Sequence, residues 1–279
     1  MATETTVNSA GAWRPDLQAF APVDVVPDAL ILETSTVAGS VEGDAPVVRV
    51  AYVDDADAQF TDEGAAIPEA DPDLSEALIH TRKITQLVRL SREQYAQNGT
   101  AEQLATSVSR AVTKKANLAY VAQVAPTLPA VAPVAGLVNV SGIVAGDAVT
   151  GSLDALVDLI AELQANDATP THLILDPLGW AELRKLKTAT GSNQSLIGAG
   201  VEDAALTLLG LPVIVSNVMP ASTGLVVDKT AVISAAGSIL IATSTDAYFG
   251  SDSIGLRATW RIGHTVPRPD RLGKFTIGE

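Results

Sequence analysis

Few residues in this sequence could carry out chemistry, and each has a simpler structural explanation. Asp176 ends an apolar run, THLILD (171–176), and precedes Pro177, where a carboxylate could act as a general base. An Asp-Pro pair between a strand and a helix is also a typical helix N-cap, and we favour that interpretation of Asp176. The histidines are too widely separated to have the spacing of metal ligands: His80, His172 and His264. The sequence therefore predicts no catalytic residue and no metal site.

Two loops have the composition of ligand-binding loops without the required spacing. An EF-hand starting at Asp55 would need glycine where Phe60 stands, and Gln59 would occupy a ligand position. The glycine loop GAGVED (198–203) ends in Asp203 where a dinucleotide-binding loop has its last glycine, and no strand leads directly into it. Three asparagines occur in glycosylation-type triplets, but the sequence has no secretion signal: Asn98, Asn139 and Asn193. We expect no cofactor.

The composition describes an acidic globular protein. The 279 residues are 47% apolar and 18% charged, which argues against disorder and allows one or two domains. Because cysteine is absent, disulfides and thiolate sites are excluded. A net charge of −14 repels phosphate and argues against tight or sequence-specific binding of nucleic acid. The N-terminus lacks the basic start and the apolar segment of a signal peptide. No apolar run is long enough for a membrane helix.

The first third of the chain predicts a long arm with an acidic tip. A strand-like run covers 47–53 and a second one, ALIHTRKITQLVRLS, covers 77–91. Between and at the edges of these runs stand nine carboxylates without any Lys or Arg: Asp54, Asp55, Asp57, Asp62, Glu63, Glu69, Asp71, Asp73 and Glu76. An isolated pair of strands is marginally stable in water, so an ordered arm needs another surface.

The elements that follow predict a long helix and then an α/β region. Thr100 and Gln103 form a capping box that opens a helix of about 22 residues, or roughly 33 Å, which Pro126 ends. Its apolar stripe is predicted as Leu104, Val108, Ala111, Val112, Leu118, Ala119 and Ala122. Further helices are expected over 153–163 and 177–189, with strands over 171–176, 212–217, 224–229, 231–236, 238–243 and 256–262. In the last of these, Arg257, Thr259 and Arg261 alternate with apolar residues, which predicts one basic and one apolar face.

Four stretches together resemble one family in the right order. LILDPLGWAELRKLKTATGSNQSLIG (173–198) and LLGLPVIVSNVMPASTGLVVD (208–228) look like the A-domain of tailed-phage major capsid proteins with the Hong Kong 97 fold. FTDEGAAIPEADPDLSEALIHTRKITQLVRLSREQ (60–94) resembles the E-loop of that family, and LRATWRIGHTVPRPDRLGKFTIG (256–278) resembles its P-domain strands. The resemblance covers about residues 15–279.

The resemblance implies an α+β capsid fold with five segments. These would be an N-terminal arm (1–40), an E-loop (41–88), a P-domain with a spine helix (89–148), an A-domain (149–242) and the C-terminal P-domain strands (243–279). The implied function is non-enzymatic: self-assembly as hexamers and pentamers into the icosahedral head of a virion that encloses double-stranded DNA. The implied partners are a portal, a separate scaffold protein and a possible decoration protein, with host cytoplasm as the place of assembly. The alternatives are an encapsulin-type nanocompartment shell and, more remotely, a soluble α/β enzyme.

Two further expectations concern contacts between subunits. Crosslinking relatives join an E-loop lysine to a P-domain asparagine, but here residues 50–81 contain no lysine and residues 243–279 contain no asparagine. We therefore expect no covalent crosslinks. The acidic arm is also expected to dock on the basic face around Arg257 and Arg261 of a neighbouring subunit.

Overall fold

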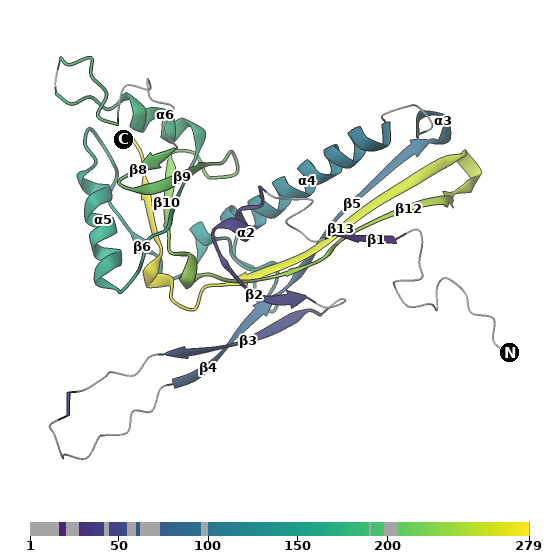
Figure 1. Ribbon diagram of the computed structural model, residues 1–279, viewed down its shortest axis with the longest axis horizontal. Helices are drawn as coiled ribbons and strands as arrows, with labels where there is room; N and C mark the ends of the chain where they lie inside the picture. The colour runs from purple at the N-terminus through teal and green to yellow at the C-terminus, as the bar shows by residue number, and fades with distance from the viewer. Residues whose placement is uncertain are drawn as a thin grey trace.

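The protein has an elongated shape with two sheet regions and a projecting hairpin (Figure 1). The structure is a computed structural model that describes residues 17–20, 28–41, 45–54, 60–61, 73–95, 100–189, 191–197 and 206–278. Among the helices in these ranges, none is long and apolar enough to cross a membrane.

The first sheet is built around one long strand, β13 (Ser253–Thr265). β5 (Arg82–Ser91) pairs with it antiparallel on one side, and β12 (Ile239–Tyr248) and β11 (Ile233–Gly237) pair with it on the other side. The sheet is completed by β1 (Leu17–Phe20), beside β12, and β2 (Thr36–Val41), which runs parallel to β11. The predicted alternation of β13 is confirmed, because Leu256, Ala258, Trp260 and Ile262 are buried while the arginines between them are not.

One long helix, α4 (Thr100–Ala122), packs along β5 and β13 (Figure 1). Its extent agrees with the prediction, although the side chain of Thr100, and with it the capping box, lies outside the described residues. The predicted stripe is partly wrong, because Leu118 is exposed. The buried positions repeat every four residues, so that each lies above the last on one helix face: Val108, Val112, Ala116 and Tyr120.

The second sheet forms a separate layer with its own core. Its strands run in the order β6 (Val144–Ala145), β14 (Gly273–Thr276), β10 (Thr223–Val227), β7 (His172–Leu175), β9 (Leu211–Val215) and β8 (Thr207–Leu208). Residues of α5 (Asp154–Ala165) and α6 (Pro177–Lys185) share an apolar cluster with this sheet, which includes Leu159, Leu183 and Phe275. The prediction that α6 extends to residue 189 is wrong, because the extended backbone of Leu186 ends the helix.

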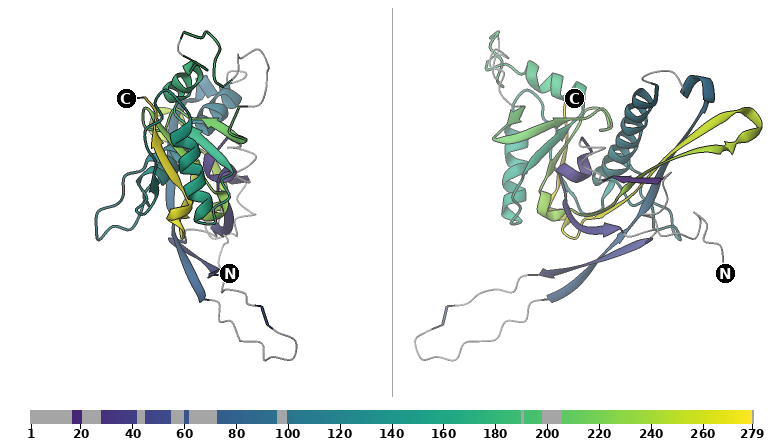
Figure 2. Two further views of the ribbon diagram at one scale, coloured as in Figure 1. Left: turned by 90° about the vertical axis from the view of Figure 1, so that its left-hand side faces the viewer. Right: turned by 45° about the vertical axis from the view of Figure 1, so that its right-hand side comes forward.

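The third unit is a two-stranded hairpin that extends away from the rest of the chain (Figure 2). β3 (Val47–Asp54) pairs antiparallel with β4 (Asp73–His80) over eight residue pairs, from Val47–His80 at one end to Asp54–Asp73 at the other. The predicted arm is therefore confirmed, but its second strand is not one run over 77–91. β4 ends before Thr81, and the residues after Thr81 form β5 in the first sheet.

Candidate assembly interface

Asp176 is a helix cap, as the sequence predicts. Its side chain is buried and accepts hydrogen bonds from the backbone N–H groups of Leu178 (3.1 Å) and Gly179 (3.0 Å) at the start of α6. These bonds satisfy amides that have no partner inside the helix. The carboxylate is therefore held by backbone donors, as a structural cap would be.

A second buried aspartate, Asp228, has a similar role that the sequence analysis missed. It accepts hydrogen bonds from the backbone N–H groups of Thr169 (2.9 Å) and Thr230 (2.8 Å), and so joins two loops that are far apart in sequence. The run Asp-Lys-Thr after an apolar strand could have indicated this cap.

The three histidines lie in different places. His172 is in β7, whereas His80, at the end of β4, and His264, in β13, line the same pocket. Across the ranges that the structure describes, no three His, Cys, Asp or Glu side chains come close enough to hold a metal ion. His264 is buried, its Nε2 lies 3.0 Å from the carbonyl oxygen of Ala135, and its ring meets that of Tyr120 edge-on. Burial lowers the pKa of His264 to about 4, so its ring is neutral at neutral pH.

The root of the hairpin is fixed by polar contacts at Thr81. Its N–H donates to the carbonyl of Pro46 (2.9 Å) and its hydroxyl donates to the carbonyl of Ala45 (2.6 Å). A guanidinium N–H of Arg261, in β13, donates to the Thr81 hydroxyl oxygen (3.1 Å). Ile79, at the same root, is fully buried against Val41 and Ala235. These contacts fix the position at which the hairpin joins the rest of the chain.

One face of the hairpin is exposed to solvent, whereas the other face packs against the rest of the chain through Ala77 and Ile79. Leu78 is 46% exposed, and the Arg49–Glu76 ion pair across the strands is 3.7 Å long and solvent-exposed. Such a pair contributes about 0–1 kcal/mol. The acidic tip lies mostly outside the described residues, but Phe60, which is described, is fully exposed.

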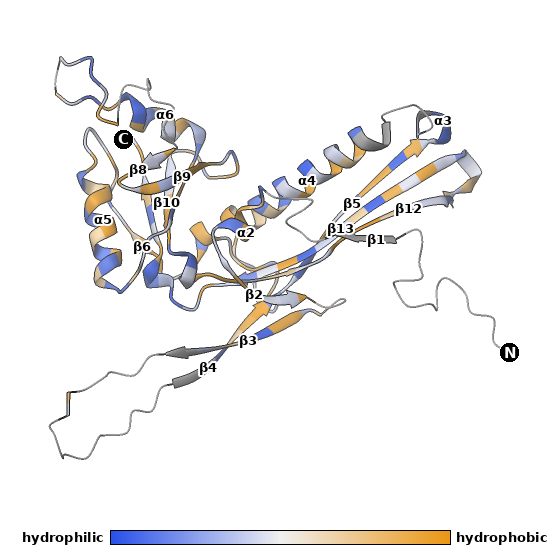
Figure 3. Ribbon diagram, viewed as in Figure 1, coloured by the Kyte–Doolittle hydropathy of each residue, from blue (hydrophilic) through white to orange (hydrophobic). Residues whose placement is uncertain are grey.

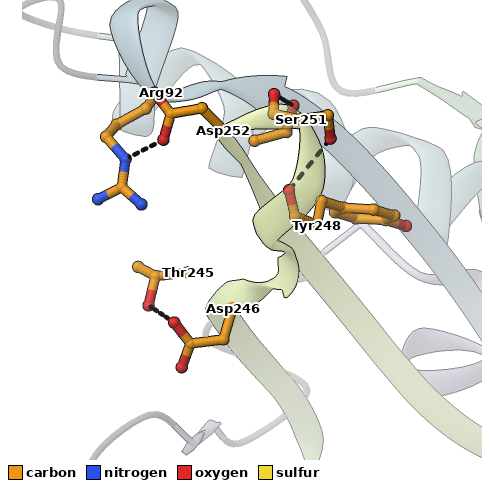
Figure 4. A network of polar contacts seen from close by, with 7 residues as sticks. Arg92, Thr245, Asp246, Tyr248, Ser251 and Asp252 are labelled. Carbon is orange, nitrogen blue, oxygen red and sulfur yellow. Dashed lines mark hydrogen bonds and ion pairs between the residues drawn. The ribbon is translucent and has the colours of Figure 1, made fainter.

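The end of the first sheet at the turn between β12 and β13 also projects from the rest of the chain (Figure 1), and Figure 4 shows the polar contacts at this turn. Arg92, in α3 (Arg92–Tyr95), binds Asp252 with an Nε–Oδ1 distance of 2.7 Å. The guanidinium of Arg89 lies 4.8 Å from the ring centroid of Tyr248. These contacts stabilise the turn between β12 and β13, on which Phe249 is 86% exposed. Phe249 therefore gives this turn one exposed apolar side chain.

A cavity of about 340 Å³ opens beside the root of the hairpin, and we call it the basic pocket. Its apolar walls come from α4, β5, β13 and the loop after α4, and include Ile84, Ala119, Tyr120, Pro133, Val134 and Ile262. Arg82, Lys83 and Lys115 also line it, and among the described residues no acidic side chain does. The pocket therefore offers an apolar interior with positive charge around it.

Two further basic residues, Arg257 and Arg261, lie on β13 outside the lining of the basic pocket. Arg261 pairs with Lys83, and Arg257 pairs with Leu87, across the two strands. Arg257 is exposed, as docking of an acidic segment requires. Arg261 is half-buried and already donates to Thr81. Arg261 therefore has a role within its own subunit that the sequence did not indicate.

Several solved structures have a similar fold. A solved structure from Gordonia phage Cozz is similar over 90% of this chain and 87% of that chain, with 14% identity and a TM-score of 0.68. The capsid of a native GTA particle matches with 16% identity, 90% coverage of each chain and a TM-score of 0.66. A structure from Microbacterium phage Oxtober96 covers 100% of this chain and 96% of that chain, with 14% identity and a TM-score of 0.68. No curated protein sequence matches the chain.

These likenesses confirm the predicted fold class, an α+β arrangement of the Hong Kong 97 type. The family model described as "Phage capsid family" matches residues 30–277, which include the second sheet, the long helix, the hairpin and every strand of the first sheet except β1. The chain belongs to the phage capsid family.

Proposed function

We propose that the chain is the major capsid protein of a tailed phage and assembles as hexamers and pentamers into an icosahedral head that encloses double-stranded DNA. Its membership of the phage capsid family supports the shell function. The observation that carries the proposal is the β3–β4 hairpin. It is an ordered two-stranded element that leaves the body at Thr81 and exposes Leu78. A hairpin of this kind needs a further surface, which a neighbouring copy would supply.

Several elements of the structure support the segments that we propose from the resemblance. Within the proposed E-loop (41–88) lies the hairpin, and within the proposed P-domain (89–148) lies α4 as the spine helix. The proposed A-domain (149–242) includes α5, α6 and most strands of the second sheet. β14 belongs to the second sheet although its residues fall in the proposed C-terminal P-domain segment (243–279), so this boundary does not follow the sheets.

The proposed partners follow from the function. A scaffold protein would guide assembly in the host cytoplasm, a portal would occupy one vertex, and decoration proteins would bind the finished shell. DNA would be enclosed without sequence-specific binding, because the chain has a net charge of −14.

Co-expression with the scaffold and portal proteins of the same phage, followed by sedimentation and negative-stain microscopy, tests the proposal. We expect closed shells of uniform size. A variant in which residues 55–72 are replaced by an Asn-Gly turn keeps β3 and β4 but removes the tip, and it should give folded subunits with few closed shells. If the unaltered chain stays a folded monomer with both partners present, the proposal is wrong. Shells that contain a cargo enzyme and no DNA would indicate an encapsulin-type compartment instead.

A further inference from the structure

Phe60 is an exposed aromatic side chain in the acidic segment between β3 and β4. It is fully exposed to solvent, with a relative exposure of 109%. Burying a Phe side chain contributes about 1.5–3 kcal/mol, and aromatic anchors in pockets dominate many protein interfaces. In the sequence, Phe60 stands among carboxylates: Asp55, Asp57, Asp62 and Glu63. A surface that takes Phe60 should therefore combine an apolar cavity with positive charge.

The basic pocket has this combination. Its walls include the ring of Tyr120 and the aliphatic side chains of Ile84 and Ile262. Arg82 and Lys115 line the same pocket, and Arg82 donates a hydrogen bond (2.9 Å) to the carbonyl of Ala132 in the loop after α4. That bond holds the guanidinium beside the cavity, where it can meet a carboxylate.

The distribution of charge along the chain supports an attraction between these two regions. Residues 1–81 contain 16 of the 32 acidic residues and only two of the 18 basic residues, Arg14 and Arg49, so the net charge of −14 arises there. Residues 82–279 carry equal numbers of acidic and basic residues. A contact that joins the first region of one copy to the basic pocket of another reduces repulsion between copies.

The geometry of the hairpin favours a pocket in another copy for Phe60. His80, which lines the pocket, pairs with Val47 at the root of the hairpin, and Asp54 pairs with Asp73 at the other end. Seven residues of strand separate the two ends by about 23 Å. Phe60 follows Asp54 by six residues, which span at most about 21 Å, so reaching its own pocket would require a fully extended path back along the hairpin. In the structure Phe60 is instead fully exposed and does not line that pocket.

We propose that Phe60 of one subunit inserts into the basic pocket of a neighbouring subunit, where the carboxylates beside it in sequence pair with Arg82, Lys83 and Lys115. This proposal rests on the proposed capsid function and names the contact that supports the hairpin. The phosphate backbone of DNA is the other polyanion that this site could meet. It is disfavoured because a backbone phosphate has no apolar group to fill the walls formed by Tyr120, Ile84 and Ile262.

Photocrosslinking locates the contact directly. A benzophenone amino acid replaces Phe60, and assembly uses a mixture of this chain and isotopically heavy, unsubstituted chain. After irradiation, mass spectrometry should join residue 60 to heavy peptides from 82–85, 115–123 or 133–134 in assembled shells. Crosslinks within one chain, or to heavy peptides from other regions, would overturn the proposal while the shells themselves still support the capsid function. If the unaltered chain forms no shells, both proposals fail together.

Paired variants give a second test that needs no unnatural residue. Phe60→Ala should weaken each contact by about tenfold or more, the effect of losing 1.5–3 kcal/mol of burial, and Phe60→Trp should restore much of the shell yield. Lys115→Glu should reduce shell yield, whereas Lys114→Glu, the same charge change one residue earlier on α4 and outside the basic pocket, should not. Equal losses for Lys114→Glu and Lys115→Glu, or unchanged yield for Phe60→Ala, would contradict the proposal. Loss of packaged DNA without loss of shells in Lys115→Glu would indicate that the pocket binds phosphate.

Discussion

Arg261 donates a hydrogen bond from its guanidinium to the hydroxyl oxygen of Thr81 at 3.1 Å, although the two residues are 180 positions apart. The bond joins β13 to the point where β4 ends and β5 begins. At that point the chain leaves the projecting hairpin and enters the first sheet. The direction of the hairpin therefore depends on a side chain from the C-terminal part of the protein.

Arg261→Ala should loosen the root of the hairpin. Removing the donor breaks a hydrogen bond to a charged group and should cost about 1.5–3 kcal/mol of stability. Hydrogen exchange of the β3–β4 amides in unassembled subunits should become faster. The matched control is Arg257→Ala, on the same strand face but exposed, which should leave exchange unchanged. Equal exchange in both variants would show that the Thr81 contact does not hold the hairpin.

Arg257→Glu should make assembly less efficient and less dependent on salt. Arg257 is the exposed arginine of the basic face that was expected to attract the acidic arm of a neighbour. Each exposed ion pair contributes only about 0.2–1 kcal/mol, but the contact repeats at every subunit. Shell yield against NaCl concentration measures the effect, since the Debye length falls from about 10 Å at 0.1 M to about 3 Å at 1 M. Lys187→Glu, on an exposed loop after α6, controls for net charge, and an identical salt profile for both variants would exclude docking at Arg257.

Mature shells should release single subunits when boiled in detergent. The expected reactants of a lysine–asparagine crosslink are missing, since 50–81 has no lysine and 243–279 has no asparagine. Electrophoresis of purified virions should show one main band near 28.7 kDa. A ladder at multiples of that mass would show that another pair of residues reacts.

His264 should make the subunit less stable in mild acid. Its pKa is about 4 in the folded chain, below the ordinary value of 6.5, so the unfolded chain binds the proton first as pH falls. The stabilisation that neutral His264 provides is fully present above pH 6.5 and is lost as the pH falls from 6.5 to 4. At pH 5 the loss amounts to about 2 kcal/mol of unfolding free energy. Arg82, Lys83 and Lys115 line the same pocket, and none of its described lining residues is an acid that would favour a protonated His264.

Denaturant unfolding of unassembled subunits at pH 7 and pH 5 measures this effect. His264→Gln should be less stable than the unaltered chain at pH 7, because it loses the packing against Tyr120. Its stability should change less between the two pH values. An undiminished pH dependence in His264→Gln would assign the effect to other groups.

Asp176→Ala should destabilise α6 without changing the shell. Loss of an N-cap costs about 0.5–2 kcal/mol, and both backbone N–H groups that Asp176 accepts from would lose their partner. Asp176→Asn should retain most of the stability, because an amide oxygen also caps helices. Thermal unfolding of the subunit is the measurement. A change in shell architecture with unchanged stability would contradict a purely structural role.

Features that depend on neighbours in sequence were predictable. Asp176 before Pro177 predicted a cap because the amides it satisfies are two and three residues away. The alternation of Arg257 and Arg261 with buried residues predicted the two faces of β13, since strand geometry alone sets that period. The length of α4 followed from its start at Thr100 and from Pro126, which cannot continue a helix.

Features that depend on residues far apart in the chain were decided only by the tertiary structure. The run 77–91 has one continuous strand-like pattern, yet it divides at Thr81 because β3 pairs with one half and β13 with the other. Leu118 has an apolar side chain and was predicted to be buried. It is exposed because of the direction in which α4 lies on β5 and β13. The basic pocket joins side chains of His80, Lys115 and His264, which no local pattern connects. The spacing of apolar residues along the sequence determines which side of a helix or strand is apolar. The pairing of elements that are distant in sequence determines which surface that side contacts.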